Sequence, residues 1–147
     1  MSASAEEDVT TVVEDDVPVD AVARPAALIP ESCPLPEAWA RLHHDPARAG
    51  VVVRDGLPIA VVTAGGLAER WPAGGPLVQY RWTVHDALDR PCGVEVLAAE
   101  DTFTYAGRRL LATGLPALPV RRRTVDDPLR ILTTTDVLRA LLGEWGP

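Results

Sequence analysis

A seven-residue pattern occurs twice in this chain, and it constrains the fold more than any other feature of the sequence. Residues 19–25 and 85–91 align at an offset of 66 and share Asp, Ala, Arg and Pro in register. Self-similarity at a fixed offset indicates two copies of one supersecondary unit, neither of which buries its apolar face alone. We therefore expect two related halves that share a core.

The expected elements follow the same order in both halves. Each half begins with a short apolar strand, continues with a helix that has one apolar face, and adds two strands and a second helix that begins at a threonine. In the first half they fall at residues 27–29, 35–42, 51–53, 58–62 and from Thr63; in the second half, at residues 94–97, 103–110, 118–120, 129–132 and from Thr133. The expected fold class is α/β (α+β), with two β-α-β-β-α repeats packed about a pseudo-twofold axis.

The composition divides the chain into four segments. Six acidic residues and no basic residue lie in residues 1–16, which is typical of a solvated, disordered tail. Residues 17–71 form the first expected repeat and residues 82–147 form the second. The Gly- and Pro-rich residues 72–81 form the expected linker between them. The two repeats together make one module. Outside the tail, 15 acidic residues stand against 14 basic ones, and this balance argues against a nucleic-acid-binding surface.

The sequence carries no signal for a membrane, a metal or a catalytic site. No apolar run is long enough to span a bilayer, and acidic residues stand where a signal peptide needs a basic start. The cysteines and histidines lack the spacing of a metal site, and no catalytic triad order or phosphate-binding loop occurs. We expect a cytoplasmic protein without enzymatic activity and with no membrane, nucleic-acid or metal partner.

The two strand pairs end in similar sequences, Pro-Ile-Ala-Val-Val-Thr at residues 58–63 and Ile-Leu-Thr-Thr-Thr-Asp at residues 131–136. They resemble the Gly-apolar-apolar-Ser/Thr-x-x-Asp motif that ends each unit of a CBS domain pair, and the resemblance covers about residues 17–146. It implies a module that often forms homodimers. It also implies clefts that in many members bind an adenosine-containing ligand such as AMP, ADP, ATP or S-adenosylmethionine.

The resemblance assigns the ligand to the cleft of the second repeat. It implies that Asp136 accepts hydrogen bonds from both ribose hydroxyls, and that Thr133 and Thr135 contact ribose or phosphate at a helix N-terminus. The apolar slot for the base would be lined by Leu118, Val120 and Ile131. Arg130 would either narrow this cleft or pair with a phosphate. In the first repeat Gly66 stands at the acid position, so the ribose ligand is missing there.

Two functions stay open at this point. In the first, the module is a regulatory sensor that binds an adenosine-containing ligand, needs no other cofactor, and signals to a partner protein. In the second, both clefts are degenerate and the fold serves only for dimerisation or docking. Asp136 favours the sensor and Gly66 favours the structural module. Thr133 with Asp136 is also the pattern of a capping box, which stabilises a helix start without any ligand.

Two further patterns concern surfaces. Arg121, Arg122 and Arg123 form either a phosphate-facing patch or a solvated edge, and strand alternation favours the edge because it splits the three side chains across two faces. In the last helix, a stripe at helical spacing predicts a packed apolar face made of Leu138, Leu141, Leu142 and Trp145.

Overall fold

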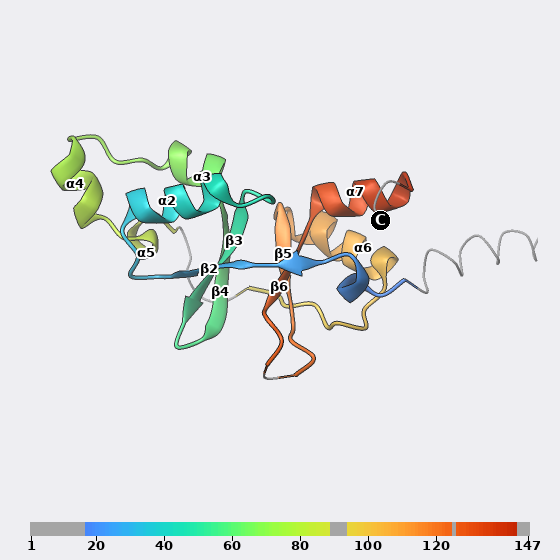
Figure 1. Cartoon of the computed structure of the whole chain (residues 1–147). Helices are drawn as coiled ribbons and strands as arrows, with labels where there is room; N and C mark the ends of the chain where they lie inside the picture. Colours follow the sequence, from blue (N-terminus) through green and yellow to red (C-terminus); the bar gives the residue numbers. More distant parts are fainter. Residues whose placement is uncertain (1–16, 89–93, 125, 144–147) are drawn as a thin grey trace, which may run out of the picture. The chain divides into compact units, whose positions relative to one another are not determined.

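The computed structural model describes residues 17–88, 94–124 and 126–143 (Figure 1). The chain forms two compact units: Ala26–Val96, called here the β2 unit, and Met1–Pro25 together with Leu97–Pro147, called the β6 unit. Residues 17–25 therefore pack with the second half of the chain, whereas the sequence assigned residues 17–71 together to the first repeat. The expected acidic tail, residues 1–16, lies outside the described residues, as does Trp145.

The β2 unit contains a three-stranded sheet in the order β2-β3-β4. Strand β2 (Ala27–Pro30) is parallel to β3 (Ala49–Arg54), and β3 is antiparallel to β4 (Leu57–Thr63). Helix α2 (Leu35–His44) connects the two parallel strands, and α3 (Ala64–Glu69) follows β4. The strand-helix-strand-strand-helix order expected for the first half is therefore confirmed.

A two-residue turn sets the register of the hairpin between β3 and β4. Asp55 and Gly56 both have positive φ, at 51° and 79°, and Arg54 pairs with Leu57 across the turn. A type I′ turn requires positive φ at both central positions, and Asp-Gly is a preferred sequence for it. The hairpin predicted from these two residues is confirmed.

One face of α2 covers the core of the β2 unit. Leu35, Ala38 and Leu42 are fully buried, and Trp39 is partly buried against the same core. The other core side chains come from the sheet strands, the turn between β2 and α2, and the short helices: Ile29, Cys33, Val52, Ile59, Val62, Ala64, Leu67, Val84 and Ala87. The apolar helical spacing read from the sequence thus corresponds to the buried face.

Two short helices follow α3 in the β2 unit. Helix α4 (Pro76–Arg81) falls within the expected linker, residues 72–81, and has no buried residue. Helix α5 (Val84–Ala87) begins with a capping box, in which Thr83 and Asp86 exchange side-chain and backbone hydrogen bonds. The linker boundaries stay a prediction, because an exposed helix is compatible with a connection between repeats.

The β6 unit contains the second sheet, in the order β1-β6-β5. Strand β6 (Arg130–Thr133) is antiparallel both to β5 (Ala117–Val120) and to the two-residue strand β1 (Arg24–Pro25). Helix α6 (Phe103–Thr113) precedes β5, α7 (Thr134–Leu141) follows β6, and the short 3-10 helix η1 (Val19–Ala21) precedes β1. The helix and the two later strands expected for the second half are confirmed.

The strand expected at residues 94–97 is largely wrong. Val94–Val96 have no regular structure, and Leu97 forms a single parallel bridge with Val120. A turn follows at once, because Asp101 accepts a hydrogen bond from Ala98 N at 2.8 Å and Asp101 N donates to Ala98 O. This turn leads the chain into α6 and leaves one residue of parallel pairing.

The packed face expected on the last helix is also wrong. Leu138, Leu141 and Leu142 have relative exposures of 54%, 56% and 72%. The side of α7 that faces its unit instead carries Asp136 and Val137, both buried. Helical spacing fixes which side chains share a face, and here that apolar face points away from the core.

Candidate functional site

The junction of β6 and α7 holds the residues that the sequence singled out. Thr133 is the N-cap of α7, and its Oγ1 accepts a hydrogen bond from Asp136 N at 3.0 Å. Asp136 Oδ2 accepts in return from Thr133 N at 3.1 Å. Both residues are buried, with relative exposures of 7% and 4%. The capping box anticipated as one interpretation is therefore present.

A third residue, Arg24, completes this site from the other end of the sequence. Strand β1 pairs Arg24 with Ile131 of β6, which places its side chain at the start of α7. Arg24 Nε donates to Asp136 Oδ1 at 3.0 Å, and Nη2 donates to the same oxygen. The sequence reasoning missed this partner, although Arg24 belongs to the identities shared by the two repeats and so carried a signal.

The arrangement satisfies a buried charge. A carboxylate removed from water needs hydrogen bonds and an opposite charge, because desolvation otherwise costs several kcal/mol. Asp136 has both, and no buried side-chain nitrogen or oxygen in the described residues lacks a hydrogen-bond partner. The guanidinium side of the pair is less enclosed, since the Arg24 side chain is 30% exposed. Arg24 is therefore the more solvent-accessible partner of this ion pair.

The remaining predicted site residues divide into polar groups that reach solvent, namely Thr135 and the partly buried Arg130, and residues of the core. Thr135 is exposed one residue before Asp136. Arg130 is held in place, because its Nη1 donates to Ala23 O at 3.3 Å and its Nε lies 3.5 Å from Asp20 Oδ1. The expected lining of the base slot is fully buried: Leu118, Val120 and Ile131. These three side chains form core, and no part of them is open to solvent.

The equivalent junction in the β2 unit keeps the cap and lacks the acid. Thr63 Oγ1 accepts a hydrogen bond from Gly66 N at 2.9 Å, as Thr133 does from Asp136 N. Glycine supplies no carboxylate to return the bond or to meet a ribose. The two junctions thus share their helix start and differ in their chemistry.

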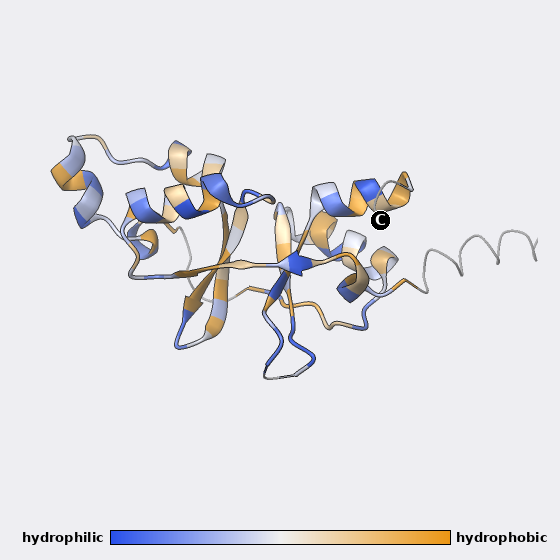
Figure 2. Ribbon diagram, viewed as in Figure 1, coloured by the Kyte–Doolittle hydropathy of each residue, from blue (hydrophilic) through white to orange (hydrophobic). Residues whose placement is uncertain are grey.

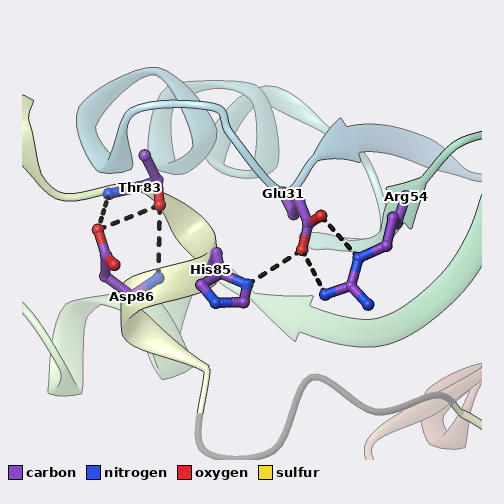
Figure 3. A network of polar contacts seen from close by, with 5 residues as sticks. All are labelled: Glu31, Arg54, Thr83, His85 and Asp86. Carbon is purple, nitrogen blue, oxygen red and sulfur yellow. Dashed lines mark hydrogen bonds and ion pairs between the residues drawn. The ribbon is translucent and has the colours of Figure 1, made fainter.

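A separate polar network lies at one edge of the β2 unit (Figure 3). Glu31 accepts hydrogen bonds from Arg54 Nε at 2.7 Å and Nη2 at 2.9 Å, and lies 3.0 Å from His85 Nδ1. That imidazole nitrogen must carry a proton in this contact, because a carboxylate can only accept. The network connects the end of β2, the end of β3 and helix α5, so we interpret it as a structural clamp.

Arg54 sets the ionisation of this clamp. The pKa of Glu31 is lowered from 4.5 to about 2, and the hydrogen bonds from Arg54 are the largest cause, with a smaller contribution from His85. A depressed pKa means that the carboxylate stabilises the fold above pH 4.5 and that this contribution is lost as the pH falls towards 2. The clamp should therefore persist through mildly acidic conditions.

We predict that Arg54→Gln returns the pKa of Glu31 towards 4.5, whereas His85→Gln moves it less. The reason is that Arg54 supplies two charge-assisted hydrogen bonds and His85 only one contact. A carbon-detected NMR titration of the Glu31 carboxyl measures both variants. A larger change in His85→Gln than in Arg54→Gln would contradict this assignment.

Two other kinds of feature are absent from the described residues. No group of three or more His, Cys, Asp or Glu side chains there is placed to hold a metal ion. Over the same part of the chain, none of the helices has the length and apolar character needed to cross a bilayer.

Comparison with solved structures identifies the fold. The chain is similar to the CBS domain of a bacterial CNNM/CorC family Mg²⁺ transporter in complex with ATP, with a TM-score of 0.72, 16% identity and coverage of 96% of this chain and 99% of that one. A CBS domain from a Sphaerobacter thermophilus membrane protein is similar with a TM-score of 0.69 and 18% identity, and the match covers 94% of this chain and 96% of that one. The CBS-pair protein CBSX2 from Arabidopsis thaliana is similar with a TM-score of 0.64 and 21% identity, and the match covers 86% of this chain and 94% of that one.

These similarities show that the chain has the fold of paired CBS domains, which confirms the resemblance read from the sequence. No protein-family model and no curated protein matches the chain. At identities of this size the likeness concerns the fold, and the function has to be argued from the site.

Proposed function

We propose that this chain, having the CBS-pair fold, is a regulatory module without catalytic activity that binds an adenosine-containing ligand at the β6–α7 junction and signals to a partner protein. The observation that carries the proposal is Asp136, a buried carboxylate whose Oδ1 is held by a partly exposed arginine. Structures similar to this one include a CBS domain in complex with ATP and CBSX2 in complex with AMP, which supports the choice of ligand class.

The proposed binding step is an exchange of hydrogen-bond donors. Arg24 now presents two N–H donors to Asp136 Oδ1, and a ribose presents two vicinal O–H donors. When the diol replaces the guanidinium, Arg24 is released beside the ligand, where it can pair with a phosphate. The exposed hydroxyl of Thr135 and the first turn of α7 supply further donors for that phosphate.

The exchange explains how binding could be transmitted. Arg24 lies on β1, so its release from Asp136 loosens the side-chain connection between the N-terminal strand and α7. A ligand shifts a conformational equilibrium only by its differential affinity for the two states. In this proposal the two states differ in the Arg24–Asp136 ion pair, and a partner protein reads the difference at β1 or α7.

Calorimetric titration with AMP, ADP, ATP, S-adenosylmethionine and adenosine tests the proposal. We expect Asp136→Asn to weaken binding roughly hundredfold, because two charge-assisted hydrogen bonds become neutral ones. Arg24→Gln should increase the affinity for adenosine roughly tenfold, because it removes the donor that competes for Asp136. The affinity for AMP should increase less, because the variant also removes the arginine that would pair with its phosphate.

The matched control is Asp86→Asn, which alters the same kind of capping box in α5, where no ligand is proposed. Binding that is unchanged by Asp136→Asn, or reduced equally by Asp86→Asn, would show that the carboxylate of Asp136 does not hold the ligand. Failure of all five compounds to bind either wild type or Arg24→Gln would leave the structural alternative below.

The second candidate function is self-association through the helices of the β6 unit. Helices α6 and α7 border a groove of about 400 Å³, lined largely by apolar side chains: Gly107, Leu110, Leu111, Gly114, Leu115, Thr134, Val137, Leu138 and Leu141. Leu111 on its rim is 85% exposed. Exposed apolar surface of this kind marks protein interfaces, and the proposed occupant is the same groove of a second copy.

We predict that Leu138→Glu/Leu141→Glu converts a dimer to a monomer in sedimentation equilibrium, because it places four like charges at a two-fold contact. The control is Leu77→Glu, which adds a charge at an exposed leucine of α4 in the β2 unit. Wild type that sediments as a monomer, or dimers that survive in the double variant, would exclude this interface.

A further inference from the structure

An arginine-lined cavity lies in the β6 unit, at the end of the sheet away from Asp136. The cavity measures about 310 Å³ and is lined by Ala98, Ala99, Glu100, Arg121, Arg122 and Arg123. Because β5 is antiparallel to β6, the last residue of β5, Val120, pairs with the first residue of β6, Arg130. The three arginines follow Val120, whereas Asp136 lies beyond the last residue of β6. The cavity is therefore separate from the site at Asp136.

The three arginines share this cavity because none of them lies in a strand. Strand β5 ends at Val120, and residues 121–123 begin the loop to β6, which Figure 2 shows as largely hydrophilic. Successive side chains alternate between two faces only within a strand. Strand alternation therefore does not separate these arginines, and all three line one cavity.

Backbone hydrogen bonds hold the two walls of the cavity together. Arg121 N donates to Leu97 O at 2.7 Å, and Leu97 N donates to Pro119 O at 2.9 Å. The turn that follows is closed by Asp101, whose Oδ2 accepts from Ala98 N at 2.8 Å. The walls are thus fixed before a ligand arrives, which lowers the entropic cost of binding.

The charges of the cavity are not balanced. Arg123 Nε donates to Asp20 Oδ2 at 2.8 Å, so its guanidinium already has a carboxylate. Arg121 and Arg122 are exposed, and in the part of the chain that the structure describes their side chains have no hydrogen-bond or ion-pair partner. Glu100 is the one acidic residue among the lining residues described. Two unpaired guanidinium groups therefore face one carboxylate, and the cavity attracts anions.

We propose that this cavity binds a short chain of phosphate groups, with Arg121 and Arg122 donating hydrogen bonds to its oxygens. A guanidinium group is a planar fork that donates two parallel hydrogen bonds to one phosphate, so two adjacent arginines match neighbouring phosphates. Because Glu100 repels any anion, a ligand with several negative charges gains more here than one with a single charge.

The size of the cavity agrees with a small ligand. Small-molecule sites usually measure about 300–1,000 Å³, and this cavity of about 310 Å³ lies at the lower end of that range. Two or three linked phosphates supply the charge that the arginines require in little volume. The proposal does not depend on the nucleotide site at Asp136, which lies at the other end of β6.

Amide NMR of the full chain, titrated with inorganic tripolyphosphate at low salt, tests the proposal. We expect the amide resonances of Ala98, Ala99 and Glu100 to shift. Arg121→Gln/Arg122→Gln should weaken binding roughly tenfold or more, because charge-assisted hydrogen bonds to phosphate are lost. The matched control is Arg81→Gln/Arg139→Gln, which removes the same charge at exposed positions outside the cavity and should bind as wild type does. Equal weakening in the two double variants, or no shift of these amides in wild type, would overturn the proposal.

Removal of the opposing charge gives a second test with the opposite sign. Glu100→Gln should tighten tripolyphosphate binding roughly threefold, because the carboxylate in the lining no longer repels the anion. Glu69→Gln is the control, since it removes an exposed carboxylate from α3 in the β2 unit and should change the affinity little. Equal gains in the two variants would show that net charge sets the affinity, against a site in this cavity.

The phosphate chain could be free or part of a nucleotide, and titrations of Asp136→Asn distinguish the two. This variant should bind tripolyphosphate as wild type does, and loss of binding would place the anion at the β6–α7 junction and overturn the second site. Adenosine should leave the amides of Ala98, Ala99 and Glu100 unchanged, because it has no phosphate. ATP that binds no more tightly than tripolyphosphate would identify a free phosphate chain as the ligand, and tighter ATP binding would identify a nucleoside triphosphate. Shifts of these amides with adenosine alone would contradict recognition through phosphate.

Discussion

Asp136→Ala is expected to lower the free energy of unfolding by about 4 kcal/mol, well beyond the cost of losing a helix cap. Removal of one partner from a buried ion pair costs about 3–5 kcal/mol, because the other charge is left without compensation. The ion-pair term lies at the lower end of that range because the Arg24 side chain is 30% exposed and can reach water. Loss of the hydrogen bond to Thr133 N adds the usual capping term of about 1 kcal/mol.

The control is built into the chain. Asp86 forms the same capping box with Thr83 in α5, where Asp86 is exposed and Thr83 is partly buried. Asp86→Ala should therefore cost about 1 kcal/mol. Guanidinium denaturation of both variants, read by circular dichroism, gives the comparison. Similar losses for the two variants would mean that Arg24 contributes little to the stability of the junction.

A double-mutant cycle separates the ion pair from the cap. Asp136→Asn keeps an oxygen that can accept from Thr133 N and removes the charge that meets Arg24. Arg24→Gln removes the same charge pair from the other side. If the pair is the main term, the double variant should be no less stable than the worse single one. Additive losses would indicate that each side chain acts through other contacts.

Local signals in the sequence predicted much of this junction. The threonine and the acid three residues later form a capping box through contacts inside one helical turn, so their spacing alone defines the geometry. The turn at Asp55 and Gly56 was predictable for the same reason. The repeat identities marked Arg24 as a position of interest, but its contact with Asp136 was not predictable, because that contact spans 112 residues and depends on the pairing of β1 with β6. A two-residue strand leaves no periodic pattern to detect.

Periodicity was also a partial guide for the apolar residues. It identified the buried face of α2, with Leu35 and Leu42, where helix and sheet belong to one unit. On α7 it identified a real apolar face whose Leu138 and Leu141 are exposed. Spacing determines which residues share a face, whereas burial depends on what packs against that face. The clamp of Glu31 was missed for a related reason, since its partners come from separate elements of the β2 unit.

Gly50→Ala is expected to destabilise the protein by about 2–3 kcal/mol, the second large effect that the structure predicts. Gly50 of β3 pairs with Ala27 of β2, and a Cβ at this position would lie 2.8 Å from Ala27 O and 2.8 Å from Leu42 Cδ2. The side chain of Leu42 can move only within a filled core. The carbonyl of Ala27 belongs to the parallel pairing of β2 with β3, so it cannot move without disturbing the sheet. Either the strands separate or α2 moves away from the sheet.

Gly65→Ala is the matched control, because it adds the same methyl group where nothing lies within 4 Å. Gly65 is in α3, and alanine favours a helix over glycine by about 1 kcal/mol or less near a helix start. Thermal unfolding should therefore show a lower midpoint for Gly50→Ala and an unchanged or higher one for Gly65→Ala. An unchanged midpoint for Gly50→Ala would contradict this prediction, because it would mean that β2, β3 and α2 leave room for a methyl group at position 50.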